Sequence, residues 1–314
     1  MTSLILNEKM RENKFQGQYV IITPVKNEER SLPDLIQSVV NQTVKPVLWV
    51  IVDDGSIDRT PEIIKEAKEK HEWIQSIRLN GSVRDRGIHL ASVIRKGIEF
   101  AYEYCEKMGI KFEYLGNIDA DVVLENTYFE HLLKKFESNP KLGIASGELW
   151  LKEGDKAFRL ELRYPDGGDI LYRRECFENC GGIPLTVCND SVLNAKAKLR
   201  GWEVRRFNDS KAYVIRRHCH AGRLWHEYIK EGKSSYILNY NLIYAILKGL
   251  KLLFEKPYYI GFAYLYGYLS SLILREEQIN DEEIKYYYKF IRPREINCYY
   301  INILKNKFKI KRKR

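Results

Sequence analysis

Three clusters of acidic residues could hold a cation or move a proton. They are the segment 53–60 (Asp-Asp-Gly-Ser-Ile-Asp-Arg-Thr), the segment Asp119-Ala120-Asp121, and the pair Asn189-Asp190. Two carboxylates spaced two residues apart can bind Mg²⁺ or Mn²⁺ through oxygen, and a diphosphate can complete the coordination shell. The plainer alternatives are turns, because Asp, Gly and Ser are turn residues, and helix caps.

Strands must position these clusters. Apolar runs predict strands at 19–23, 47–52, 74–79 and 112–118, and helical spacing predicts helices at 31–41, 60–70, 87–107 and 126–138. Ser31 and Thr60 are the predicted N-caps, and Pro61 suits a first helical position. This alternation predicts an open α/β sheet with right-handed crossovers. Ligands of such sheets bind beyond the carboxyl ends of the strands, where the first two clusters fall.

The pattern loosens after residue 142. Strands are predicted at 144–151, 158–164, 202–207 and 212–217, and a helix at 190–200. From residue 225 the chain reads as helical and rich in Tyr, Leu and Ile. We therefore expect an N-terminal extension (1–18), a catalytic domain (19–222), a helical region (223–300) and a basic tail (301–314).

From about Tyr19 to Gly222 the sequence resembles the family 2 glycosyltransferases of the GT-A fold. The resemblance rests on the segment 23–28 (Thr-Pro-Val-Lys-Asn-Glu), on 52–60, and on Asp119-Ala120-Asp121 at the family's metal-binding DxD position. It implies a nucleotide-binding α/β sheet flanked by helices. It also implies an inverting enzyme that uses Mn²⁺ or Mg²⁺ to transfer a sugar from a nucleoside diphosphate sugar to a hydroxyl acceptor.

The resemblance implies roles for individual residues. The base and ribose of the sugar nucleotide would be lined by Thr23, Pro24 and Glu28. Asp53 would contact the uracil or the ribose, with Ser56 close by, which favours UDP. Asp121 would be the direct metal ligand, and Asp119 would contact the ribose or a metal-bound water. The family's general base corresponds to Asp190, which follows the turn at Gly181-Gly182, with Asn189 in place of the usual Glu. A helix N-cap is the alternative role for Asp190.

Basic residues are expected near the diphosphate. Arg84 and Arg86 lie in a glycine-bounded loop before a predicted helix, and an arginine there suits an anion, although a solvated loop is equally open. Relatives often have a histidine after the last strand that closes over the diphosphate and ligates the metal. His218 is the candidate for this role, and His220 is the next choice.

Charge and cysteine usage restrict the class of protein. Lys and Arg exceed Asp and Glu by ten (52 against 42), and the excess falls to three without the seven basic residues of the last ten positions. The body of the chain is thus nearly balanced, which argues against a nucleic-acid binder. Six cysteines without a CxxC pair, and an N-terminus without a signal-peptide core, predict a cytoplasmic setting. A zinc site could be built from the cluster Cys176, Cys180, Cys188, His218, Cys219 and His220. Its spacing matches no common zinc pattern, so we expect buried or half-buried thiols.

The C-terminal third points to a membrane surface. Residues 257–274 carry no charge, and their helical length of about 27 Å is just short of a comfortable span. Tyrosines, which prefer the interface, pervade this segment. We favour an interfacial or shallowly inserted helical pair over a soluble subdomain or a transmembrane span. The basic tail would contact an anionic leaflet, which predicts a peripheral protein of the cytoplasmic face and a lipid-linked glycan or polysaccharide precursor as acceptor.

Two other functions compete. A nucleotidyltransferase can share a similar sheet with paired acids, but it would carry a glycine-rich loop after the first strand, and 23–28 has no glycine. A non-catalytic sugar-nucleotide-binding protein would keep the fold, but the intact acids Asp53, Asp119, Asp121 and Asp190 argue against a lost activity.

Overall fold

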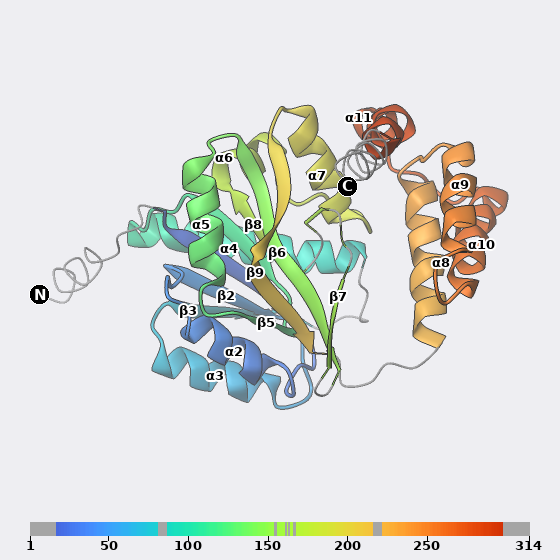
Figure 1. Cartoon of the computed structure of the whole chain (residues 1–314). Coiled ribbons are helices and arrows are strands. Elements are labelled where there is room, and N and C mark those ends of the chain that lie inside the picture. The colour runs from blue at the N-terminus through green and yellow to red at the C-terminus, as the bar shows by residue number, and fades with distance from the viewer. Residues whose placement is uncertain are drawn as a thin grey trace, which may run out of the picture. The chain divides into compact units, whose positions relative to one another are not determined.

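The computed structural model describes residues 17–80, 87–153, 156–160, 162, 164–165, 168–215 and 222–297. The chain divides into two compact units, Met1–His218 and Cys219–Arg314. The first unit is an α/β sheet with helices on both faces, and the second unit is helical (Figure 1).

Within the described residues of the first unit, nine strands form one mixed sheet in the order β3-β2-β1-β4-β8-β6-β9-β5, and β7 pairs with β6. The strands are β1 (Tyr19–Val25), β2 (Leu48–Asp53), β3 (Ile74–Arg78), β4 (Tyr114–Ile118), β5 (Val122–Leu124), β6 (Leu142–Glu153), β7 (Lys156–Arg159), β8 (Asp169–Arg173) and β9 (Glu203–Ile215).

The carboxyl ends of the parallel strands lie side by side at one edge of the sheet. Strands β3, β2, β1 and β4 run parallel, and Asp53 pairs with Val25 on one side and with Arg78 on the other. Strand β8 runs antiparallel to β4, with Asp169 opposite Ile118. The segments that follow β1, β2, β3 and β4, and the segment that precedes β8, therefore meet at the same edge.

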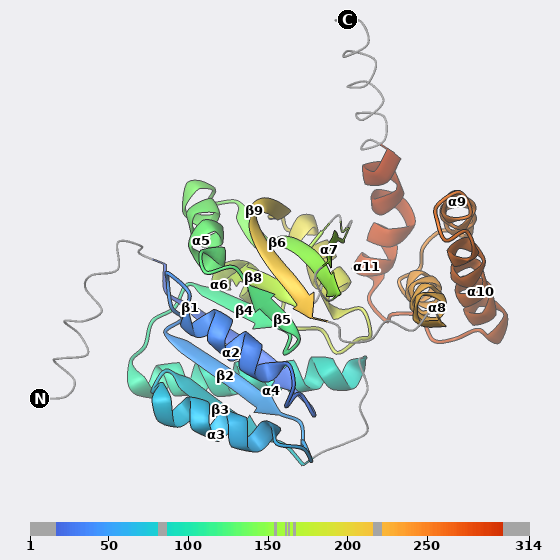
Figure 2. The same cartoon turned by 60° about the horizontal axis from the view of Figure 1, so that its bottom comes forward.

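Helices cover both faces of this sheet (Figure 2). One layer holds α2 (Leu32–Val40), α3 (Thr60–Lys70) and α5 (Tyr128–Ser138), and the other holds α4 (Ile88–Met108), α6 (Arg174–Asn179) and α7 (Asn189–Leu199). Alternate residues of β1 serve the two layers, so that Tyr19 and Ile21 face the first while Val20 and Ile22 face the second. Cover on both faces explains why β1 and β2 read as almost unbroken apolar runs.

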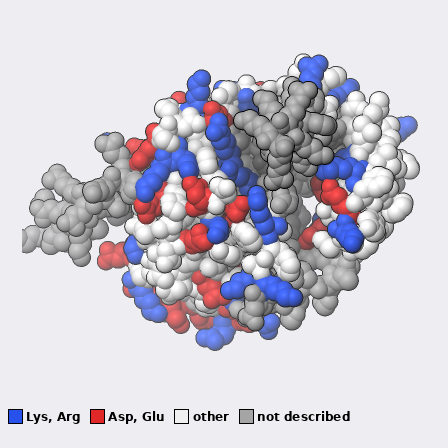
Figure 3. Space-filling model, in the orientation of Figure 1, with Lys and Arg blue, Asp and Glu red and all other residues white. Residues whose placement is uncertain are grey.

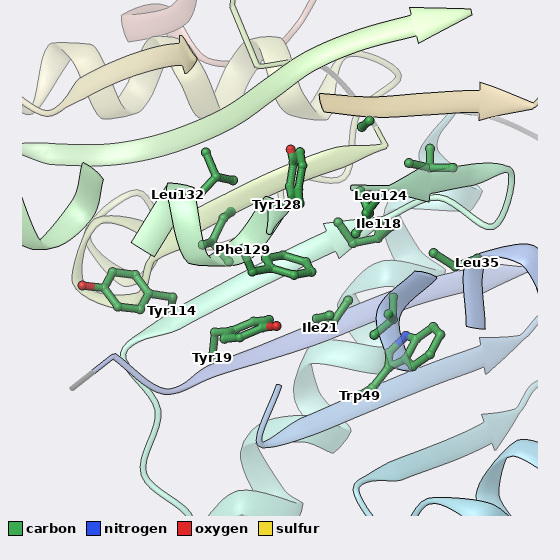
Figure 4. Packing of buried hydrophobic residues seen from close by; sticks show 14 of the residues in the cluster. Tyr19, Ile21, Leu35, Trp49, Tyr114, Ile118, Leu124, Tyr128, Phe129 and Leu132 are labelled. Atoms are coloured by element: carbon green, nitrogen blue, oxygen red, sulfur yellow. The ribbon is translucent and has the colours of Figure 1, made fainter. Parts of the chain in front are cut away.

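Aromatic rings from β1, β2, β4 and α5 pack among aliphatic side chains in the first layer (Figure 4). The rings of Tyr19 and Phe129 lie 4.5 Å apart, which joins β1 to α5. The polar ends of buried rings find partners, because an unpaired buried donor is costly. The Tyr19 hydroxyl donates to the carbonyl of Val44 at 2.6 Å, and Trp49 Nε1 donates to Thr23 Oγ1 at 2.9 Å.

The second unit contains α8 (Gly222–Ile237), α9 (Leu242–Leu252), α10 (Tyr259–Leu274), α11 (Glu282–Tyr286) and a π-helical turn over Tyr287–Ile291. Helices α8 and α10 approach closely at Gly267, where an added Cβ would collide with the carbonyl of Ile229. Tyr236, Tyr264 and Tyr268 form part of a small core. In the part of the chain that the structure describes, every helix is too short or too polar to cross a membrane.

Several predicted elements were wrong in extent. The strands expected at 202–207 and 212–217 are one strand, β9, because residues 207–210 form a bulge between two stretches that pair with β6, and the carbonyl of Ser210 lies close to Gly147. The strand expected at 158–164 ends at Arg159. Helix α3 has Arg59 as its N-cap rather than Thr60, and Ser31 caps α2 without a side-chain hydrogen bond to the helix. Elements β5, β8 and α6 were not predicted.

Candidate active site at the edge of the parallel strands

The loops that follow β1 and β2 are hydrogen-bonded to each other. The backbone N–H of Asn27 donates to Ser56 Oγ at 2.9 Å, and the N–H of Ile57 donates to Asn27 Oδ1 at 2.8 Å. Asn27 and Gly55 both have left-handed backbone (φ 55° and 68°), which Asn and Gly adopt most readily. We call residues 26–31 and 54–60 together the loop clasp.

Two further bonds close the clasp. The N–H of Glu28 donates to Thr60 Oγ1 at 2.8 Å, and the N–H of Glu29 donates to Asp58 Oδ2 at 3.1 Å. The hydroxyl of Thr60 thus holds the other loop instead of capping its own helix. Burial tends to raise the pKa of Asp58, but hydrogen bonds from the side chain and N–H of Thr60 and from the N–H of Glu29 outweigh it and lower that pKa.

Asp53 is fixed inside the edge of the sheet and is only 3% exposed. Its Oδ1 accepts from the N–H of Ser56 at 2.8 Å, and its Oδ2 lies 3.2 Å from Arg78 Nη1. Arg78 also donates through Nη2 to the carbonyl of Ser56 at 2.8 Å. Asp53 and Arg78 line a pocket of about 330 Å³ between β3 and α3. The Asp53–Arg78 ion pair thus lies at the wall of a pocket.

Asp54 serves the opposite face, as expected for the next residue after a strand. Its Oδ2 lies 3.0 Å from Lys26 Nζ and 2.9 Å from His89 Nε2, in the first turn of α4. Its Oδ1 is buried and has no hydrogen-bond partner within the described residues. Asp54 therefore ties the clasp to α4.

The three residues expected to line the nucleotide base and ribose differ in their burial. Thr23 is fully buried, and its hydroxyl is occupied by Trp49. Pro24 is half-buried opposite Val52. Glu28 is half-buried, and its Oε2 accepts from Ser31 Oγ at 2.6 Å. Their roles at a nucleotide stay predictions.

Asp119 and Asp121 follow β4 at the same edge. The N–H of Asp119 donates to the carbonyl of Gly168 at 3.1 Å, and a Cβ on Gly168 would lie 2.9 Å from the Asp119 carboxylate. The Asp121 carboxylate is half-buried and makes no hydrogen bond or ion pair with the described residues. Its carbonyl accepts from the N–H of Ile215 at 2.9 Å, so the end of β9 lies directly beside it.

Asp190 lies in the first turn of α7, whose N-cap is Cys188, so the alternative role of Asp190 as the helix cap is wrong. One turn further on, buried Asn194 donates through Nδ2 to the carbonyl of Pro165 at 2.7 Å. That contact joins α7 to the segment that leads to Gly168, the neighbour of Asp119. The predicted Gly181-Gly182 turn is present, with φ of 81° and 73°.

Three predicted site residues, Arg84, Arg86 and His218, lie outside the described residues. Among those described, no group of three or more His, Cys, Asp and Glu side chains is arranged to hold a metal ion. Cys176 and Cys180 are buried, and Cys188 is half-buried. A hydrogen bond with Cys180, together with burial, raises the pKa of the Cys176 thiol.

Sequence reasoning missed Lys26, Arg78 and His89. Arg78 lies near the end of the predicted strand 74–79, beside the strand that leads to Asp53, so strand register could have paired the two residues. His89 lies at the start of α4, the helix that packs on the face of the sheet to which Asp54 points. The only sequence signal for this pairing is that successive residues such as Asp53 and Asp54 point to opposite faces of a strand.

Comparisons with known proteins show the family and the fold. The sequence model of glycosyl transferase family 2 matches residues 20–181. The poly-beta-1,6-N-acetyl-D-glucosamine synthase of Staphylococcus epidermidis is 22% identical, with 88% of this chain and 70% of the relative covered.

Two solved structures share the fold. A mannosyltransferase from Pyrobaculum calidifontis in complex with GDP-Man and Mn²⁺ has a TM-score of 0.53 at 15% identity, over 87% of this chain and 80% of that one. GalNAc-T7 with UDP, GalNAc and Mn²⁺ has a TM-score of 0.52 at 13% identity, over 84% and 57%. Because the family match covers about half of the chain, the protein belongs to glycosyl transferase family 2 and is a glycosyltransferase with a GT-A-like α/β fold.

Proposed function

We propose that this glycosyltransferase transfers a sugar, with inversion and with a divalent cation, from a nucleoside diphosphate sugar to a hydroxyl group of a glycan acceptor. The observation that carries the proposal is the Asp121 carboxylate. It stands at the carboxyl edge of the parallel strands, two residues after Asp119, and the described residues leave it without a hydrogen bond or ion pair. Elsewhere at this edge, Asp53, Asp54 and Asp58 are held by protein groups.

The donor is bound at the strand edge in this proposal. The clasp and the Asp53–Arg78 pair present fixed polar groups around the ends of β1, β2 and β3, which is where ligands of open α/β sheets bind. Arg84 and Arg86 would contact the diphosphate. UDP is the favoured nucleotide, and the solved relatives named with GDP-Man and with UDP make both diphosphates suitable probes.

The residues at the edge fit a hard cation. Mg²⁺ and Mn²⁺ prefer oxygen ligands, and Mg²⁺ commonly uses one or two carboxylates together with substrate phosphates. Asp121 would supply the direct carboxylate, with Asp119 beside it. We propose His218 as a further ligand, because in the sequence it follows by three residues Ile215, whose N–H binds the Asp121 carbonyl. A bound cation would neutralise charge on the leaving diphosphate.

Asp190 acts as the general base in the proposed reaction. The acceptor oxygen forms a bond to the anomeric carbon while the bond from that carbon to the diphosphate oxygen breaks on the opposite side. The acceptor proton passes to the Asp190 carboxylate, and the nucleoside diphosphate leaves with the electron pair of the broken bond. Proton transfer to a positioned carboxylate contributes roughly 10²–10⁴ in rate.

The acceptor is proposed from the relatives. The name of the Staphylococcus epidermidis relative describes a β-1,6-linked N-acetylglucosamine polymer. We therefore take a polysaccharide precursor, or a lipid-linked glycan, as the acceptor of this chain. A β-1,6-linked N-acetylglucosamine oligosaccharide is the first acceptor to test.

The test measures nucleoside diphosphate release with Mn²⁺ from UDP-GlcNAc, UDP-glucose and GDP-mannose in the presence of that oligosaccharide. Asp190→Asn should lower turnover at least a hundredfold and leave thermal stabilisation by the diphosphate unchanged. Asp209→Asn, a surface carboxylate paired with Lys135, is the matched control and should keep full turnover. Turnover of Asp190→Asn within tenfold of the native chain, or loss of diphosphate binding, would contradict the assignment.

A further inference from the structure

Two helices of the second unit turn their large apolar side chains outward. Ile243, Leu247 and Leu250 on α9 are 69%, 59% and 44% exposed, and Phe262, Tyr266 and Ile273 on α10 are 61%, 60% and 78% exposed. The spacing of three, four or seven residues aligns each set along one side of its helix. We call these six residues the outward face. Figure 3 shows the region over α9 and α10 at the right edge as largely free of charged groups, with Lys and Arg and some Asp and Glu at its borders.

The inward sides of the same helices carry small residues. A Cβ added to Gly249 would collide with the Leu265 side chain, and one added to Gly261 would meet the carbonyl of Gly249. The inner side of α10 also holds Ala263 and Gly267, beside the buried rings of Tyr264 and Tyr268. A helix of a water-soluble domain puts its large apolar residues inward. Small residues at the helix contacts and large apolar residues outside are typical of helices that contact lipid.

The same unit carries nearly all of the net charge. Residues 219–314 contain 18 Lys and Arg against 9 Asp and Glu, whereas residues 1–218 contain 34 against 33. Helix α10 has no charged residue, and Lys256 and Arg275 flank it. Seven of these 18 basic residues lie at 305–314, outside the described residues, and residues 222–297 contain 11 Lys and Arg against 9 Asp and Glu. An apolar face on a unit with a net positive charge is complementary to an anionic bilayer, where each basic residue near the surface adds to binding.

The length of the helices sets the depth of binding. Helix α10 has 16 residues, a length of about 24 Å, which is below the roughly 30 Å of a hydrocarbon core. Tyr258, Tyr259 and Tyr266 are exposed on or beside it, and tyrosine prefers the boundary between headgroups and acyl chains. These features fit one interface of a bilayer rather than its full thickness.

We propose that the outward face of α9 and α10 binds an anionic lipid bilayer, with its apolar side chains at the boundary between headgroups and acyl chains and with the basic residues of the unit on the headgroups. A second copy of the chain is the other possible occupant, but two copies would bring like charges together, because the unit has an excess of nine positive charges. The proposal does not depend on the transfer reaction.

The test is flotation of the purified full chain with vesicles of phosphatidylcholine, alone or with 30% phosphatidylglycerol. The native chain should bind the anionic vesicles at least tenfold more tightly than the neutral ones. That binding should weaken when salt is raised, because screening shortens the electrostatic attraction. Equal binding to both vesicles, or no flotation with the anionic ones, overturns the proposal without any variant and leaves the proposed reaction untouched.

A matched pair of variants locates the surface. Phe262→Ser with Ile273→Ser removes two residues of the outward face, and Met108→Ser with Phe158→Ser removes two side chains of the first unit that are 58% and 50% exposed. The first pair should reduce vesicle binding at least tenfold, and the second should not change it. Equal binding of the two pairs would refute the assignment. The assignment would also be refuted if the native chain were a dimer in light scattering that did not bind vesicles, and if the first pair of substitutions converted this dimer to a monomer.

Discussion

The helices of the two units differ in the side on which they carry their large apolar residues. Helix α2 of the first unit turns Leu32, Leu35 and Val39 inward, where they are fully buried against the sheet. Helix α10 of the second unit turns Gly261 and Gly267 inward and leaves Phe262 and Ile273 exposed. The first unit thus buries large side chains along its helices, whereas the second combines a small tyrosine core with close backbone contacts at glycine and leaves other large apolar side chains exposed.

The largest expected effect comes from the core of the first unit. Trp49 is fully buried, stacks on Trp73 and donates a hydrogen bond to Thr23. Trp49→Ala should lower the free energy of unfolding by about 3–5 kcal/mol, measured by urea denaturation with circular dichroism. Trp49→Phe keeps a ring and should cost less. A loss below about 1 kcal/mol for Trp49→Ala would contradict the packing described for this layer.

A helix contact in the second unit should give an intermediate effect. Gly267→Ala adds a Cβ that collides with the carbonyl of Ile229, so α8 and α10 must separate. We expect a loss of about 1–3 kcal/mol in thermal unfolding. Ser270→Ala, one turn further along α10, is the control and should change stability by less than about 0.5 kcal/mol. Equal stabilities of the two variants would show that the helices do not approach closely at this glycine.

The loop clasp should contribute a smaller, pH-dependent amount. Asp58→Ala removes the acceptor for the N–H groups of Glu29 and Thr60 and should cost about 1 kcal/mol at pH 7. The pKa of Asp58 is lower in the folded chain than its ordinary value of 3.8, so the ionised form stabilises the fold above that value. This stability is lost as the pH falls through the folded pKa.

Urea midpoints at pH 7, 5 and 3 check this prediction. The difference between the native chain and Asp58→Ala should be equal at pH 7 and 5 and should narrow at lower pH. Glu66→Ala, an exposed carboxylate on α3, is the control and should have little effect at pH 7. A difference that grows on acidification would reverse the assigned direction of the pKa shift.

The smallest effect on stability is expected at the outward face. Phe262→Ser should change the free energy of unfolding by less than about 0.5 kcal/mol in lipid-free buffer, because an exposed side chain has little burial to lose. Thermal unfolding without vesicles measures this. A loss comparable to that of Trp49→Ala would mean that Phe262 is part of a protein core, and the contrast between the two units would fail.

Much of the parallel sheet was predictable, because its buried strands are short apolar runs between helical patterns. Strand β8 was not, since the run Asp169-Ile-Leu-Tyr-Arg173 is strand only through its pairing with β4 on one side and β6 on the other. The length of β9 was also hidden, because its polar residues Asn208 and Asp209 read as a turn, while tertiary pairing with β6 absorbs them as a bulge.

The acids of the candidate site were found from residue type, but their partners were not. Whether Arg78 meets Asp53 depends on strand register, and whether His89 meets Asp54 depends on which face each residue takes. Thr60 has the composition of a helix cap, yet its hydroxyl accepts from Glu28 across the clasp. Local propensity cannot rank such competing partners, because they are distant in the sequence.

Thermal unfolding with UDP, GDP, dTDP and CMP, each with and without Mn²⁺, tests the central claim most directly. We predict that one nucleoside diphosphate stabilises the native chain only with Mn²⁺, by about 2.7 kcal/mol at one hundred times its dissociation constant. Asp121→Asn should lose this Mn²⁺-dependent gain, whereas Asp209→Asn should keep it. Stabilisation that is equal in Asp121→Asn and in the native chain, or that is absent for every nucleotide, would contradict a nucleotide and metal site at this edge of the sheet.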